Sequence, residues 1–261
     1  MPRLEALGAA IATVIGQIVG MLAGIVINRR WNREIPFSLR PRPDGGCIRE
    51  ILRIGVPSAM IDILTALLTV VMNSILLGFS ATAVAVYGVM NKVRGLVTVG
   101  THGIDNGLIP IVAYNYGAKR PRRIDGAIRW ALVYSAAIYA VIFAGLELFP
   151  GPVLGLFDAS EDMTAMGVTA LRVFAVGWFL CIPGLIYAAG LQGFGQGARS
   201  MALTMARQAV LPVVLALALR ALGGSLTQIW WAFVLAEGAG IPLGACLWRR
   251  TRRDAETEMA G

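Results

Sequence analysis

Long apolar segments constrain this chain more than any other feature of its sequence. A helix needs about 20 apolar residues to cross a hydrocarbon layer roughly 30 Å thick. Seven segments meet that length: 7–27, 54–77, 82–113, 127–149, 163–191, 202–222 and 229–247. Only 15% of the residues are charged, against about 25% in soluble domains. The sequence therefore predicts an all-α polytopic membrane protein with about seven transmembrane helices.

The basic residues lie between these segments and predict the topology. The net charge is +8. Most of the Lys and Arg residues fall at 29–53, at 119–129, in the turn near Arg199 and Arg207, and at 249–253. Because basic loops stay cytoplasmic, we expect a multi-pass membrane protein with a cytoplasmic C-terminus, an N-terminus outside and no nucleic-acid partner. The first segment is too long for a signal peptide, and its basic cluster follows it, so it is expected to remain in the mature protein.

Four parts are expected along the chain. Residues 1–28 form a single transmembrane helix, and 29–50, rich in Arg, Pro and Gly, form a cytoplasmic linker. Short connections favour one six-helix lobe over 51–250, followed by a cytoplasmic tail at 251–261. Prolines at or within the spans suit a transporter, in which neighbouring helices or a wet cavity must satisfy the freed carbonyl groups.

Three carboxylates lie within apolar segments and are candidates for coupling to protons or another cation. Asp62 and Glu237 each face an insertion cost of about 2.5–3.5 kcal/mol, which a cation in a wet cavity would offset. For Asp62, a position near the headgroups or a hydrogen bond to a neighbouring helix is an equal alternative. Asp105 lies with His102 and Asn106 in a polar stretch at near-helical spacing, which could line an aqueous cleft. The lone His102 is more often a structural histidine than a ligand.

Other polar residues in the segments are candidates for lining a cavity: Asn73, Tyr87, Asn91 and Gln192. Lys92 and Arg94 lie about a dozen residues into the third segment. They could extend toward the outer surface, or one of them could pair with Asp62 or Asp105.

No pattern in the sequence supports an enzyme, a cofactor or a bound metal. The glycine-rich run 190–197 resembles a dinucleotide loop, but an apolar segment precedes it where a strand is required. We interpret the run as a helix end and a tight turn. Cys47, Cys181 and Cys246 have no metal-binding spacing and are expected to be small core residues.

Three motifs resemble those of the multidrug and toxic compound extrusion (MATE) family. They are Gly-Leu-Ile-Pro-Ile-Val-Ala-Tyr-Asn-Tyr-Gly-Ala at 107–118, Gly-Leu-Gln-Gly-Phe-Gly at 190–195, and the entry Ile-Gly-Val-Pro-Ser at 54–58. The resemblance implies a transporter of twelve spans in two lobes. Such a transporter exports amphipathic or cationic drugs in antiport with protons or sodium, by alternating access and without a cofactor. Tyr114 stands where the family pattern has Gln, and the Asn and Gly of this motif are expected to shape a helix end.

The resemblance also implies that the chain matches only part of such a transporter. Segment 7–27 would be the sixth helix, followed by the linker and the second lobe. Five spans are then expected in a missing first lobe, and the partners are the lipid bilayer, drug substrates and a separately encoded N-terminal lobe. Lys92, Arg94 and Arg172 favour a lipid-linked precursor flippase of the same superfamily as an alternative. A non-transporting remnant or membrane scaffold is another.

Overall fold

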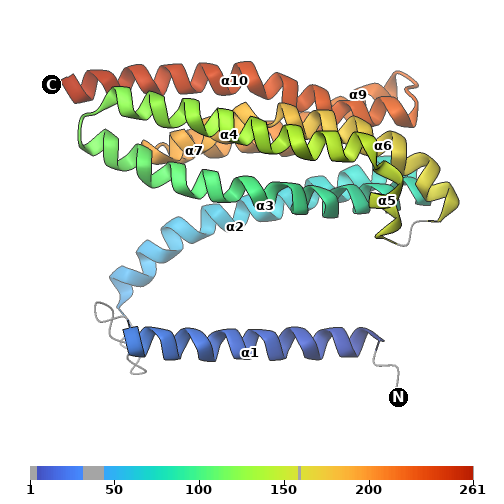
Figure 1. The fold of residues 1–261 in the computed structure, drawn as a ribbon, viewed down its shortest axis with the longest axis horizontal. Coiled ribbons are helices and arrows are strands. Elements are labelled where there is room, and N and C mark those ends of the chain that lie inside the picture. Colours follow the sequence, from blue (N-terminus) through green and yellow to red (C-terminus); the bar gives the residue numbers. More distant parts are fainter. Residues whose placement is uncertain (1–4, 32–43, 158–159, 261) are drawn as a thin grey trace. The chain divides into compact units, whose positions relative to one another are not determined.

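The computed structural model describes residues 5–31, 44–157 and 160–260, and the elements in these ranges are helices (Figure 1). The chain divides into two compact units, Met1–Pro57 and Ser58–Gly261, and each is described by itself. The expected all-α class is confirmed within the described residues.

The first unit contains α1, Glu5–Trp31, and the beginning of α2, Gly45–Leu77. The 27 residues of α1 extend about 40 Å at 1.5 Å per residue, which is enough to cross a membrane. Helix covers both ends of the expected linker, since α1 continues to Trp31 and α2 begins at Gly45. Residues 32–43 lie outside the described part of the chain.

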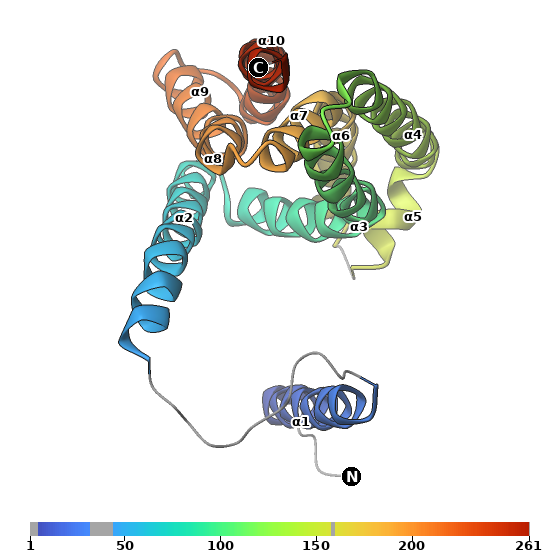
Figure 2. The ribbon, with the colours of Figure 1, turned by 90° about the vertical axis from the view of Figure 1, so that its left-hand side faces the viewer.

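The second unit is a helical lobe that begins with the later part of α2 (Figures 1 and 2). Its other elements are α3 Ala81–Gly117, α4 Pro121–Leu148, α5 Pro150–Gly155, α6 Glu161–Leu180, α7 Ile182–Gly193, α8 Gly197–Met205, the π-helical turn η1 Ala206–Val210, α9 Leu211–Ala221 and α10 Leu226–Ala260. Helix α10 packs against α6, α7 and α9, and α3 packs against α4, α6 and α7.

Two expected spans are interrupted helices. Segment 163–191 breaks at Cys181 into α6 and α7, with Pro183 in the first turn of α7. Segment 202–222 is divided by η1, and Pro212 lies in the first turn of α9. Proline has no N–H to continue the helical ladder, but it fits the first turn of a helix, where no partner is needed.

Five helical segments within the described residues are long and apolar enough to cross a membrane: Ala10–Trp31, Pro121–Leu148, Glu161–Gly193, Gly197–Ala221 and Leu226–Met259. A shorter apolar helix covers Ala66–Leu77. The chain is therefore a multi-pass membrane protein, and the spans expected at 54–77 and 82–113 stay predictions.

The lobe has a basic end and an acidic end. The α3–α4 turn and the C-terminus lie at one end, and the start of α6 lies at the other (Figure 1). At the basic end, Arg252 of α10 pairs with Asp125 of α4 at 2.8 Å, and Arg199 of α8 pairs with Asp254 at 3.2 Å. At the opposite end, α6 begins with Glu161 and Asp162. This separation of charge matches the pattern used to predict the topology.

The glycine-rich motifs are helix ends, as expected. Helix α7 ends at Gly193, and Gly195 follows with φ +73°, which favours glycine. A Cβ at Gly193 would lie 2.6 Å from Cβ of Val112, so the glycine permits close contact between α7 and α3. Near the end of α3, Asn115 is buried and donates to the Ile111 carbonyl at 2.8 Å.

The cysteines follow the expectation only in part. Cys181 is buried, as predicted for a core residue, whereas Cys246 is exposed. Cys246 shares a surface of α10 with the charged side chains of Arg249 and Arg250, which explains why the core prediction is wrong there. The side chain of Cys47 lies outside the described residues.

Candidate functional site

A pocket opens inside the second unit among α3, α6, η1, α9 and α10. It is lined by Met90, Asn91, Arg94, Phe174, Gly177, Trp178, Arg207, Gln208, Pro212, Phe233 and Glu237. Side chains four residues apart lie on one face of a helix. That spacing places Met90 with Arg94, Phe174 with Trp178, and Phe233 with Glu237 on the faces toward the pocket.

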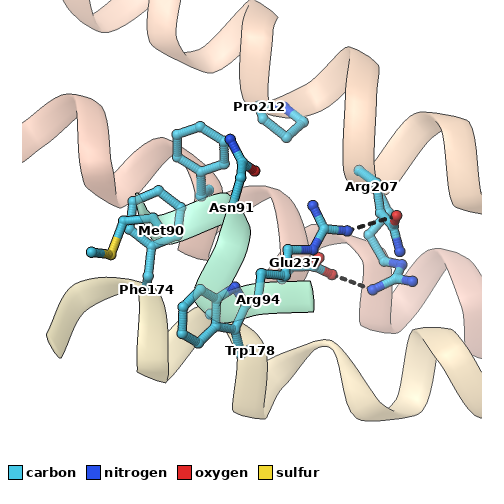
Figure 3. A pocket seen from close by; sticks show the side chains of 11 residues that line it. Met90, Asn91, Arg94, Phe174, Trp178, Arg207, Pro212 and Glu237 are labelled. Carbon is cyan, nitrogen blue, oxygen red and sulfur yellow. Dashed lines mark hydrogen bonds and ion pairs between the residues drawn. The ribbon is translucent and has the colours of Figure 1, made fainter. Parts of the chain in front are cut away.

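The pocket has an apolar end and a charged end. Figure 3 shows Met90 and Phe174 at one end and Arg94, Arg207 and Glu237 grouped at the other. The ring of Phe174 contacts that of Phe233 at a centroid distance of 4.7 Å and that of Trp178 at 5.9 Å. The volume of this pocket is only about 30 Å³, so a ligand of more than a few atoms would also need the neighbouring space described below.

The π-helical turn η1 supplies both Arg207 and Gln208 to the pocket. In this turn the N–H of Leu211 donates to the Ala206 carbonyl, five residues back. Pro212 follows and cannot donate to the Gln208 carbonyl. One wide turn rotates the following residues relative to a regular α-helix, and such turns occur often at functional sites.

Arg207 is paired deep inside the lobe. Its Nη1 lies 2.5 Å from Oε2 of Glu237, and the two side chains are 1% and 13% exposed. The same Nη1 donates to the Cys181 carbonyl at 3.3 Å, at the break between α6 and α7. Its Nε and Nη2 are buried without a hydrogen-bond partner among the described residues. Arg207 thus links η1 to α10 and to the α6–α7 break.

Two glycines make room for this arginine. A Cβ at Gly184 would lie 2.7 Å from Nε of Arg207, and one at Gly240 would lie 2.5 Å from its Cδ. Any side chain at either position would overlap the arginine unless it moved. The sequence therefore accommodates the buried guanidinium from both α7 and α10.

Arg94 provides the second positive charge. Its Nη2 donates to Oε1 of Gln208 at 2.8 Å (Figure 3). Arg94 is half-buried and has no carboxylate partner within ion-pair distance in the described part of the chain. The expected alternatives for Arg94 were extension to the outer surface or pairing with an aspartate. In the structure its described hydrogen bond is instead to a neutral amide.

A second pocket continues from the first toward α2. The two share Asn91, Arg94, Gln208, Pro212 and Phe233, and the second adds Leu68, Thr69, Met72, Tyr87, Ala209 and Val213. Together they form a cleft that runs from the Arg207–Glu237 pair to the later part of α2. Tyr87 and Asn91, both expected to line a cavity, lie in this cleft.

The other predicted residues lie elsewhere. Asp105 is half-buried, and its Oδ1 has no hydrogen-bond partner among the described residues, while His102 and Asn106 are exposed. Asn73 is half-buried and lines neither of these two pockets. Gln192 donates to Oγ of Ser200 at 3.1 Å, across the turn between α7 and α8.

The side chain of Asp62 lies outside the described residues, so its role stays a prediction. Glu237 lines the first pocket, and its proposed coupling role also stays a prediction.

The sequence-based interpretation missed Arg207 as a pocket residue. It was counted with the cytoplasmic loop near Arg199, which is wrong because the side chain is 1% exposed. A signal was available, since Arg207 falls within the apolar segment 202–222, where a charge requires a partner.

Of the three basic residues that favoured the flippase alternative, only Arg94 lines the pocket. Lys92 is exposed, and Arg172 pairs with Glu147 at the lobe surface.

Solved structures share this fold. An outward-facing multidrug resistance MATE family transporter of the MOP superfamily matches with a TM-score of 0.82 and 23% identity, over 97% of this chain and 59% of that one. A MOP superfamily transporter from Pyrococcus furiosus matches with a TM-score of 0.82 and 24% identity, over 95% of this chain and 57% of that one. At these identities the likeness concerns the fold.

Relatives in sequence include the multidrug export protein MepA of Staphylococcus haemolyticus, 26% identical over 236 residues, which are 90% of this chain and 52% of the relative. MepA of Staphylococcus saprophyticus is 27% identical over 235 residues, 90% of this chain and 51% of the relative. The chain thus spans about half the length of these relatives. The MatE family model matches residues 57–218, and the chain belongs to the MatE family of membrane transporters.

Proposed function

We propose that this chain forms the second lobe of an efflux transporter that moves amphipathic small molecules by alternating access. Its membership of the MatE family supports transport rather than enzyme chemistry. The observation that carries the proposal is the pocket inside the lobe, where an aromatic wall meets charged side chains. Pockets for small molecules are mostly apolar and contain a few polar groups that orient the ligand. A pocket of this kind suits amphipathic small molecules.

The proposed transport step requires a second lobe-like body, because alternating access moves one bundle against another around a central site. The MepA relatives are about twice the matched length, and their additional part is the natural source of that body. We therefore propose a first lobe as a partner, supplied on the same or a separate polypeptide. The expected location is the bacterial inner membrane, with the basic end and the C-terminus in the cytoplasm.

Efflux tests this proposal directly. Cells lacking their own pumps would produce the chain alone, the N-terminal half of a staphylococcal MepA alone, both together, or neither, and retention of cationic and anionic dyes would be measured. We expect efflux from the pair and none from either half alone. Equal efflux from the chain alone would refute the need for a first lobe, and absence of efflux from the pair would count against transport.

Coupling to protons or sodium is proposed for the carboxylates of the lobe. Glu237 is already paired with Arg207, whereas a buried oxygen of Asp105 has no partner among the described residues. A cation or a proton at Asp105 would relieve the cost of that burial. We therefore place Asp105 ahead of Glu237 as the coupling residue, with Asp62 as a further candidate.

The coupling proposal predicts the behaviour of two matched variants. Asp105→Asn should reduce ion-driven efflux and remove its dependence on pH or on sodium. Asp125→Asn, which changes an exposed aspartate at the basic end, should leave both unchanged. Unchanged coupling in Asp105→Asn would assign Asp105 a structural role.

A further inference from the structure

The charges around the pocket do not balance. Its lining contains the guanidinium groups of Arg94 and Arg207 but only one carboxylate, that of Glu237. Arg207 and Glu237 hold each other at 2.5 Å. Arg94 faces a neutral amide, that of Gln208, at 2.8 Å. The pocket therefore has a net positive charge, located at Arg94.

A cationic ligand would bind poorly at this end. It would have to displace Arg207 from Glu237, and the arginine is buried, with only 1% of its surface exposed. Separating a buried ion pair leaves an uncompensated charge, which is strongly unfavourable. The ligand would also approach the unpaired charge of Arg94.

An anionic ligand meets the opposite situation. A carboxylate or sulfonate can accept hydrogen bonds from Arg94, because a guanidinium presents five N–H donors in a planar fork and only one of its nitrogens is bonded to Gln208 here. The anion would reduce the cost of holding an unpaired arginine in a half-buried site.

The rest of the ligand would lie in the second pocket, which Arg94 also lines and whose volume is about 190 Å³. There the rings of Phe233 and Tyr87 contact each other at a centroid distance of 5.5 Å, and Met72 adds an adaptable apolar side chain. Flat aromatic bodies pack against such rings with favourable offset or edge contacts.

We propose that this cleft binds small amphipathic organic anions, with an aromatic body against Phe233 and Tyr87 in the second pocket and a carboxylate or sulfonate at Arg94. The inference rests on the proposed transport function and narrows its substrate class. It differs from the cationic drugs that the sequence led us to expect.

A pair of probes with the same ring and opposite charge tests the proposal. Binding of 2-naphthoate and of 2-naphthylmethylammonium to the purified chain in phosphatidylcholine nanodiscs would be measured by equilibrium dialysis, with empty nanodiscs subtracted. We expect naphthoate to bind at least about tenfold more tightly. Arg94→Met should weaken naphthoate binding about tenfold or more, the effect of losing one charge-assisted hydrogen bond, whereas Arg94→Lys should retain part of it.

Lys92→Met is the matched control, because Lys92 carries the same charge two residues away but is exposed and lies outside both pockets. It should bind naphthoate like the parent chain. Tighter binding of the ammonium probe, binding of neither probe, or equal naphthoate affinity in Arg94→Met and the parent would each overturn the proposal. These results would leave the transport proposal standing, since efflux is measured separately.

A lipid headgroup is the other source of an anion with an apolar body. The same dialysis in nanodiscs containing phosphatidylglycerol distinguishes the two sources. Unchanged naphthoate affinity would support a soluble anion. Displacement of naphthoate by phosphatidylglycerol would overturn that assignment in favour of a lipid ligand.

Discussion

The Arg207–Glu237 pair makes a strong prediction about stability. Arg207 is 1% exposed and has one carboxylate partner among the described residues, at 2.5 Å. Glu237→Gln keeps the shape of the side chain but removes its charge, so the guanidinium would stay buried without compensation. Breaking a buried pair in this way costs about 3–5 kcal/mol. At about 2–4 °C per kcal/mol for a chain of this size, the midpoint of thermal unfolding in detergent should fall by roughly 6–20 °C.

The double variant Arg207→Met/Glu237→Leu separates this account from a general packing effect. It removes both charges together, and replacing a buried pair by apolar side chains is often neutral. We expect it to unfold at a higher temperature than the Glu237→Gln variant. As a control, Glu147→Gln breaks the partly exposed pair with Arg172, which spans 3.5 Å, and should cost at most about 1 kcal/mol. A Glu237→Gln variant as stable as the parent would refute the reasoning, because it would show that the Glu237 carboxyl carries no needed charge.

Two further predictions concern packing and topology. Gly240→Ala should destabilise the lobe by about 1–3 kcal/mol, because its Cβ would lie 2.5 Å from Cδ of Arg207. Gly238→Ala on the same helix has nothing within 4 Å of its Cβ and should be neutral or slightly stabilising; equal effects in thermal unfolding would contradict the close approach. In a chain whose native cysteines are replaced, Glu161→Cys should react with an impermeant maleimide on intact cells, and Lys119→Cys only after the membrane is opened. The reverse pattern would invert the proposed topology.

The sequence predicted those features of the fold that depend on local composition. Apolar length located the helices, and the glycines after Gln192 and the Asn115 motif predicted where α7 and α3 end. Pro183 and Pro212 lie where expected spans are interrupted. The apolar segment expected at 229–247 lies within α10, and the helix continues beyond it. Its last turns are charged and still helical to Ala260, with Arg252 and Glu256 paired one turn apart at 2.7 Å.

The pocket could be predicted only in part, because it depends on which faces of distant helices meet. Glu237, Tyr87 and Asn91 could be selected because polar groups in apolar segments need partners. The pairing of Arg207 with Glu237 could not be predicted, because it depends on how η1 and α10 are aligned and on the extra rotation of a π-helical turn. The contact of Arg94 with Gln208 could not be predicted either, because the two residues are 114 positions apart in the sequence.

The central claim is that this pocket carries the transported molecule, and blocking it tests that claim most directly. Asn91 lines both pockets, whereas the neighbouring Lys92 lines neither. In cells that produce the chain with the N-terminal half of MepA, dye efflux would be compared for Asn91→Trp, which fills the cleft, and Lys92→Trp, which adds the same bulk outside it. The account predicts that Asn91→Trp abolishes efflux while Lys92→Trp retains it at equal protein levels. Full efflux from the Asn91→Trp variant would contradict the account.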